Sequence, residues 1–116
     1  MEFGVRKEGK IAIIRIRGKL NREGAIEMTS RVRQTCGSDR WAVLNLSGVI
    51  ELVSVGISCL TEIRDWTRRE GGRLVLAESS PAVKEVLKIT GLDALFLLMD
   101  TEAEAVKFLS DEAGAR

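Results

Sequence analysis

The hydrophobic pattern of the 116-residue chain predicts an α/β domain with a largely parallel sheet. Short apolar runs of strand length alternate with amphipathic stretches of helix length, in the order β, β, α, β, α, β, α, β, α. Recognisable helix start and stop residues separate these runs. A chain of this length forms one domain, which we place over residues 1–110, and we expect a flexible tail at 111–116.

The first third of the chain predicts a hairpin followed by a helix. Residues 3–6 and 11–17 read as two strands across a short Gly-containing turn, and Gly18 is expected to end the second strand. Asn21 is a natural N-cap. Apolar residues then recur at helical spacing over 22–36, which predicts an amphipathic helix.

The central segment predicts a buried strand that leads into a second helix. Residues 41–46 are almost wholly apolar, as in a central strand covered on both faces, and Ser47-Gly48 is expected to break it. Residues 49–53 are more apolar than a simple surface loop. The next helical pattern starts at Ser54 and lasts to about Arg69.

Strong local signals mark the rest of the chain. The expected elements are a strand at 73–77, a helix started by Ser80-Pro81 and stopped by Gly91, a strand at 95–99, and a last helix capped by Asp100 or Thr101.

Composition excludes several classes of function. The net charge of +1 gives no strong field for nucleic acid, and no apolar run approaches the roughly 20 residues that span a bilayer. The first residues have no apolar signal-peptide region, so we expect a soluble cytoplasmic protein that does not insert into membranes. There is no histidine, no tyrosine, no P-loop and no metal spacing of the two cysteines. We therefore expect no catalytic residue, metal or cofactor, and no enzyme activity.

Ser54 is the candidate functional residue, because it follows the central strand at the start of a helix. The simplest interpretation is that its hydroxyl only caps the helix. A phosphate there would also be stabilised by the free N–H groups and the helix dipole. We expect Ile50 and Val53 to be exposed beside it. The cations Arg64, Arg68 and Arg69 are interleaved with acidic residues, which is typical of a solvated helix face.

Several motifs together resemble the STAS family, and in particular bacterial anti-sigma factor antagonists. They are Val43-Leu-Asn-Leu46, Ser54-x-Gly56, Gly71-Gly-Arg-Leu-Val75, Ser80-Pro-Ala-Val-Lys84 and Thr90-Gly-Leu92. The resemblance covers nearly the whole chain. It implies a single SpoIIAA-like domain, with a mixed, mostly parallel sheet of about five strands and about four helices packed largely on one side.

The resemblance also implies a partner switch. In these antagonists the central loop carries Asp-Ser/Thr-x-Gly, and an anti-sigma factor that is also a serine kinase phosphorylates the residue after the aspartate. The unphosphorylated form binds that kinase, the phosphorylated form releases it, and a phosphatase resets the cycle. The phosphoacceptor position falls on Ser54, but Val53 replaces the aspartate. The expected partner-binding residues are Ile50, Val53, Val55, Gly56, Ser58, Thr61 and Asp65.

Two other hypotheses stay open at this point. The chain could be a STAS interaction module without a phosphorylation cycle, as a signalling scaffold or as the small subunit of a lipid-transporting ABC complex. An enzyme or nucleotide-binding domain is disfavoured, because no motif marks such a site. In either regulatory case we expect a monomer or a weak dimer.

Overall fold

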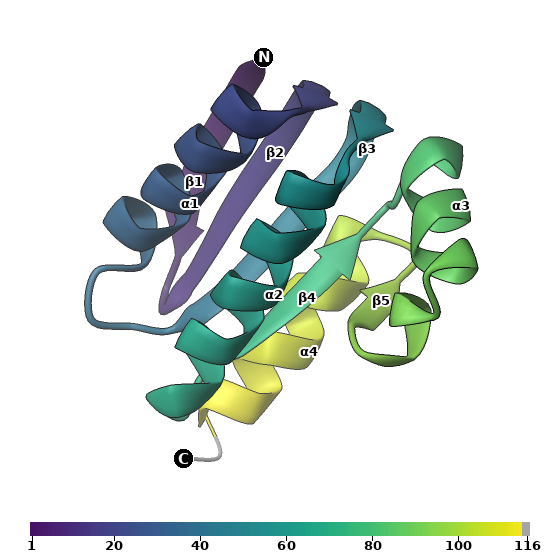
Figure 1. The fold of residues 1–116 in the computed structure, drawn as a ribbon. Helices are drawn as coiled ribbons and strands as arrows, with labels where there is room; N and C mark the ends of the chain where they lie inside the picture. Colours follow the sequence, from purple (N-terminus) through teal and green to yellow (C-terminus); the bar gives the residue numbers. More distant parts are fainter. Residues whose placement is uncertain (115–116) are drawn as a thin grey trace.

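A computed structural model describes residues 1–114 (Figure 1). The order of strands and helices agrees with the sequence prediction, and a 3₁₀ helix is added before the last strand. The elements are β1 (Glu2–Glu8), β2 (Ile11–Leu20), α1 (Arg22–Cys36), β3 (Trp41–Leu52), α2 (Ser54–Arg69), β4 (Arg73–Ala77), α3 (Pro81–Ile89), η1 (Leu92–Ala94), β5 (Leu97–Met99) and α4 (Glu102–Gly114).

The described strands form one mixed, mostly parallel sheet, as predicted, and their order across the sheet is β1-β2-β3-β4-β5. β1 runs antiparallel to β2 across the turn at Gly9, and β2, β3, β4 and β5 are parallel to one another. The carboxyl ends of the parallel strands therefore meet at one edge of the sheet, and each of the four α-helices begins at that edge (Figure 1). In open α/β sheets this edge is the usual place for a functional site.

Two predicted strand ends are wrong, because β2 and β3 continue together beyond them. Neither Gly18 nor Ser47-Gly48 ends a strand. The pairing instead shifts register at two irregularities, between Arg15 and Arg17 and between Gly18 and Lys19. Gly18 has φ of 121°, which suits glycine, and a Cβ on Gly48 would lie 3.0 Å from a β2 carbonyl oxygen. These glycines let the two strands stay paired through the bulges.

The helices cover the sheet unequally, as predicted. α1, α2 and α3 pack on one face and α4 packs on the other (Figure 1). The larger core, on the three-helix side, includes Ile14, Met28, Leu44, Leu46, Leu60, Ile63, Leu76 and Leu87. The smaller core, under α4, contains Ile11, Ile13, Trp41, Val43, Val75, Ala77, Ala105, Leu109 and Ala113.

Three predicted helix caps are confirmed. The side chains of Asn21, Ser80 and Thr101 accept hydrogen bonds from backbone N–H groups of their helices, at 3.0, 3.3 and 3.1 Å. Gly91 lies in the left-handed region with φ of 74° just after α3, as expected. The predicted strand at 95–99 starts only at Leu97, because η1 occupies the residues before it.

The expectation of a flexible tail at 111–116 is wrong for residues 111–114, which are helical. α4 continues to Gly114, because Ala113 is buried in the smaller core and Glu112 pairs with Arg73 on β4. Residues 115–116 lie outside the described residues.

Candidate partner-binding site

The candidate site lies where β3 passes into α2. The Val53 N–H donates to the Leu20 carbonyl at 3.3 Å, which ties this junction to the end of β2. The Val53 carbonyl in turn accepts from Gly56 N at 2.9 Å and from Ile57 N at 3.2 Å. The first turn of α2 is therefore fixed from both sides, by β2 and by its own helix.

The predicted cap at Ser54 is wrong by one position. Val53 is the N-cap residue in extended conformation, and it has no side chain that can accept a hydrogen bond. Ser54 is instead the first helical residue. Its side chain is exposed, and its hydroxyl has no hydrogen-bond partner among residues 1–114. The free N–H groups of a helix start lie close to this position, so a negative charge on Ser54 is electrostatically favoured.

Four of the predicted residues share one stripe of α2. Ser54, Ser58, Thr61 and Asp65 are spaced by four, three and four residues, which places them on one helical face. Ser58 and Asp65 are exposed and Thr61 is half-buried. The Ser58 and Thr61 hydroxyls donate back to the Ser54 and Ile57 carbonyls, at 3.2 and 3.0 Å. We name these four residues the polar stripe.

Ile50, near the end of β3 and four residues before Ser54, is exposed, with 67% of its surface accessible. The reason is the second bulge: Gly18 pairs with Val49 and Lys19 with Glu51, so Ile50 has no partner on β2. A bulge of this kind re-aims a side chain without ending the sheet. Val53 and Val55 are half-buried and add less apolar surface.

Gly56 lies below this surface and is itself buried. A Cβ at this position would lie 2.8 Å from both the Leu20 carbonyl oxygen and a Leu52 methyl group. Gly56 therefore allows α2 to approach β2 closely, and it offers no side chain or accessible surface to a partner.

A buried carboxylate at the start of α4 is the main charged feature that the sequence did not indicate. Glu102 is 7% exposed, and Arg15 donates to its two oxygens from Nε at 2.8 Å and from Nη2 at 2.9 Å. Asn45 Nδ2 and Arg6 Nη2 lie 3.1 and 3.0 Å from the same carboxylate. The hydrogen bonds from Arg15, together with Asn45 and Arg6, outweigh desolvation and lower the pKa of Glu102 to about 2.

The backbone at this network is also unusual. The Glu102 N–H donates to a Glu78 carboxylate oxygen at 2.9 Å, and Glu78 has φ of 51°, which is uncommon for a residue other than glycine. Because Arg15 and Glu102 are 87 positions apart in sequence, no local pattern could reveal the contact. The network anchors α4 to the sheet at its carboxyl edge, where Ser54 also lies.

One side-chain interpretation from the sequence needs correction. Arg64 is not part of a solvated face: its side chain is 23% exposed and its Nε donates to the Leu95 carbonyl at 2.9 Å. Of the two cysteines, Cys59 is half-buried and Cys36 is buried. Burial raises the pKa of the Cys36 thiol to about 11, so it stays protonated at neutral pH.

The part of the chain that the structure describes holds no cluster of three or more side chains that could ligate a metal. None of its helices is both long enough and apolar enough to cross a membrane.

Fold and site together define a small α/β domain whose candidate site is a surface patch at a strand–helix junction. The STAS domain model matches residues 2–105, so the chain belongs to the STAS domain family.

Solved structures agree with this assignment. An anti-sigma factor antagonist from Mycobacterium paratuberculosis is 23% identical, with a TM-score of 0.81 over 94% of this chain and 93% of that one. SpoIIAA in its unphosphorylated form is 19% identical, with a TM-score of 0.76 over 95% and 97%. The murine anion transporter Slc26a9 is 16% identical, with a TM-score of 0.77 over 91% of this chain but only 18% of that one. At these identities the likeness concerns the fold.

Proposed function

We propose that this chain is a regulatory protein-binding domain of the anti-sigma factor antagonist kind, and that Ser54 is its phosphoacceptor. The unphosphorylated protein binds an anti-sigma factor that is also a serine kinase, through the polar stripe together with Ile50 and Val53. Phosphorylation of Ser54 releases this partner, and a phosphatase restores binding.

The observation that carries the proposal is the position of Ser54. It is exposed, its hydroxyl has no partner among the described residues, and it opens α2 at the carboxyl edge of the sheet. A kinase can therefore reach the hydroxyl without unfolding the domain. SpoIIAA has been solved in unphosphorylated and in phosphorylated form, so a fold of this kind accommodates a phosphate.

The energetics favour a switch without a large rearrangement. A phosphoserine carries roughly −1.5 to −2 charges, and the N-terminal end of α2 stabilises such a charge in the free protein. In the complex the same charge would be desolvated against a partner that covers the exposed side chain of Ile50. A loss of about 3 kcal/mol of binding free energy weakens a complex by roughly two orders of magnitude.

The proposal is tested by incubating the purified protein with ATP and the anti-sigma factor serine kinase of its source organism. Intact mass should show one added phosphate on the wild type and none on Ser54→Ala. Ser58→Ala is the matched control, because it removes an exposed hydroxyl one turn further along α2. A phosphate that persists on Ser54→Ala would rule out Ser54 as the acceptor. Kinase binding that is unchanged by phosphorylation would rule out the switch.

One observation favours a second candidate, a STAS interaction module without a phosphorylation cycle. Val53 leaves α2 without a side-chain cap at the position where the antagonists carry an aspartate. STAS-like folds also occur within transporters, as the likeness to Slc26a9 shows. Under this alternative the same surface binds a permanent partner. The unphosphorylated protein would then bind a scaffold or an ABC-transporter ATPase, and the kinase would add no phosphate.

A further inference from the structure

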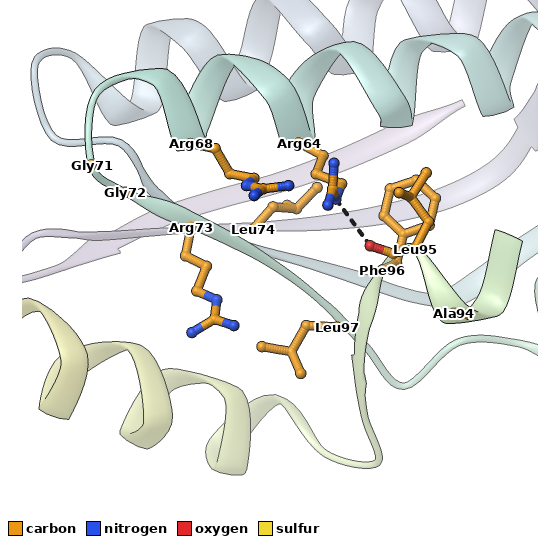
Figure 2. Close-up of a pocket in the computed structure, with 10 residues that line it drawn as sticks. All are labelled: Arg64, Arg68, Gly71, Gly72, Arg73, Leu74, Ala94, Leu95, Phe96 and Leu97. Atoms are coloured by element: carbon orange, nitrogen blue, oxygen red, sulfur yellow. Dashed lines mark hydrogen bonds between the residues drawn. The ribbon is translucent and has the colours of Figure 1, made fainter.

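A hollow of roughly 480 Å³ opens at the amino end of β4 (Figure 2). The last turns of α2 form one wall, and residues 94–97, which lead into β5, form the other. Ser54 lies at the opposite end of the 16-residue helix α2, which at 1.5 Å per residue is about 24 Å long. The hollow is thus distinct from the Ser54 end of the polar stripe.

The hollow exists because β5 is short. β5 pairs only with Val75–Ala77, so Arg73 and Leu74 at the start of β4 have no neighbouring strand on that side. The 3₁₀ helix η1 leads into β5 in place of further strand. The apolar part of its lining comes from Leu74 and Phe96, which are buried, and from the half-buried Leu95 and Leu97.

Three arginines stand around this lining. Arg64 is held in place, with Nε on the Leu95 carbonyl and Nη1 on Asp65 at 3.3 Å. Arg73 pairs with Glu112 and lies over the Phe108 ring, so it is directed toward α4. Figure 2 shows Arg68 extending from the last turns of α2 toward the hollow that it lines. Arg68 is exposed and has no hydrogen-bond or ion-pair partner within residues 1–114.

The charges sum in favour of an anion. Asp65 offsets Arg64 and Glu112 offsets Arg73, but no carboxylate of residues 1–114 forms an ion pair with Arg68. The carboxyl end of α2 opposes an anion with about half a negative charge.

That opposing effect is reduced, because the last carbonyls of α2 are already paired. Those of Trp66, Thr67 and Arg68 accept from Arg40 Nη1, Gly72 N and Gly71 N, at 3.2, 2.9 and 3.1 Å. One full positive charge on Arg68 therefore outweighs the helix end.

We propose that the hollow binds a small organic oxyanion, a phosphate monoester or a carboxylate with an apolar body of a few carbon atoms. The charged group meets the Arg68 guanidinium, whose planar fork matches the oxygens of such anions, and the Nη2 group of Arg64, since Arg64 Nε and Nη1 are already engaged. The apolar body covers Leu74, Leu95 and Leu97. The proposal is independent of Ser54 and of any partner switch.

Amide NMR titration of the isotope-labelled full chain tests this. Phenyl phosphate and benzoate are the probes, and benzyl alcohol is the neutral analogue. Both anions should shift the amide signals of Gly71, Gly72 and Leu95 and reach saturation, and benzyl alcohol should not. The tighter of the two anions identifies the charged group. Raising the salt concentration should weaken binding, because the Arg68 guanidinium is exposed.

Arg68→Gln should weaken binding of the better probe by about tenfold, a loss of one charge-assisted contact. Arg69→Gln is the matched control: it removes the same charge from the next, exposed residue, which does not line the hollow, and should change affinity less than about twofold. Both variants should melt like the wild type.

Two results would overturn the proposal: no saturable shift at these amides with either anion, or equal weakening by Arg68→Gln and Arg69→Gln. Inorganic phosphate binding as tightly as phenyl phosphate would refute the role of the apolar lining.

Discussion

Replacing Glu102 by glutamine tests how α4 is anchored. The substitution keeps the size of the side chain and removes the charge that Arg15 and Arg6 neutralise. Holding the pKa near 2 in place of the ordinary 4.5 corresponds to roughly 3 kcal/mol of stability at neutral pH. Arg15 is well exposed, so solvent screening reduces this to about 2–3 kcal/mol.

The sign of the pH dependence follows from the lowered pKa. The ionised Glu102 contributes its full stabilisation above pH 4.5, and that contribution is lost as the pH falls from 4.5 toward 2. Urea unfolding followed by circular dichroism, at neutral pH and in steps to about pH 2.5, measures it. Glu102→Gln should be less stable by about 2–3 kcal/mol at neutral pH, and the gap to the wild type should close in acid.

Glu104→Gln is the matched control, because Glu104 lies in the same first turn but is exposed. It should lose less than about 1 kcal/mol, the size of a helix-dipole effect. A stability gap for Glu102→Gln that does not change with pH, or an equal loss in Glu104→Gln, would refute the account.

Two further predictions concern packing and capping. Gly56→Ala should lower the free energy of unfolding by about 1–2 kcal/mol, because its Cβ would press on the Leu20 carbonyl, whereas Gly114→Ala, in open space, should be neutral or slightly stabilising. Ser80→Ala should cost about 1–3 kcal/mol, since the buried hydroxyl caps α3 and donates at 2.6 Å to a β3 carbonyl. Ser79→Ala should cost under about 0.5 kcal/mol, because that hydroxyl has no hydrogen-bond partner among the described residues. Chemical denaturation checks both pairs, and a control that loses as much as its partner contradicts the reasoning.

Local signals were sufficient for much of this fold. Asn21, the Ser80-Pro81 pair and Gly91 act through their own backbone neighbourhood, so their roles could be predicted from the sequence. The order of strands and helices followed from the alternation of apolar runs, and with it the place of Ser54 at the start of a helix beside the central strand.

The features that were missed depend on residues far apart in the chain. The exposure of Ile50 was predicted, but its cause was missed: the register of β3 against β2 is not specified by any pattern within β3. The hydrogen bond from Arg64 to Leu95 and the ion pair of Arg15 with Glu102 each join separate elements. The N-cap was predicted one position too late, at Ser54, because serine is a common capping residue. In the structure Val53 is the N-cap, and its N–H is bound to the Leu20 carbonyl of β2.

The helix α4, which covers the smaller core, determines where this chain can be truncated without exposing apolar residues. The STAS match ends at residue 105, whereas α4 runs to Gly114 and buries Leu109 and Ala113. A truncation at the family boundary would uncover Trp41, Val43 and their apolar neighbours to water. Such a fragment should aggregate although it retains every residue proposed to contact a partner.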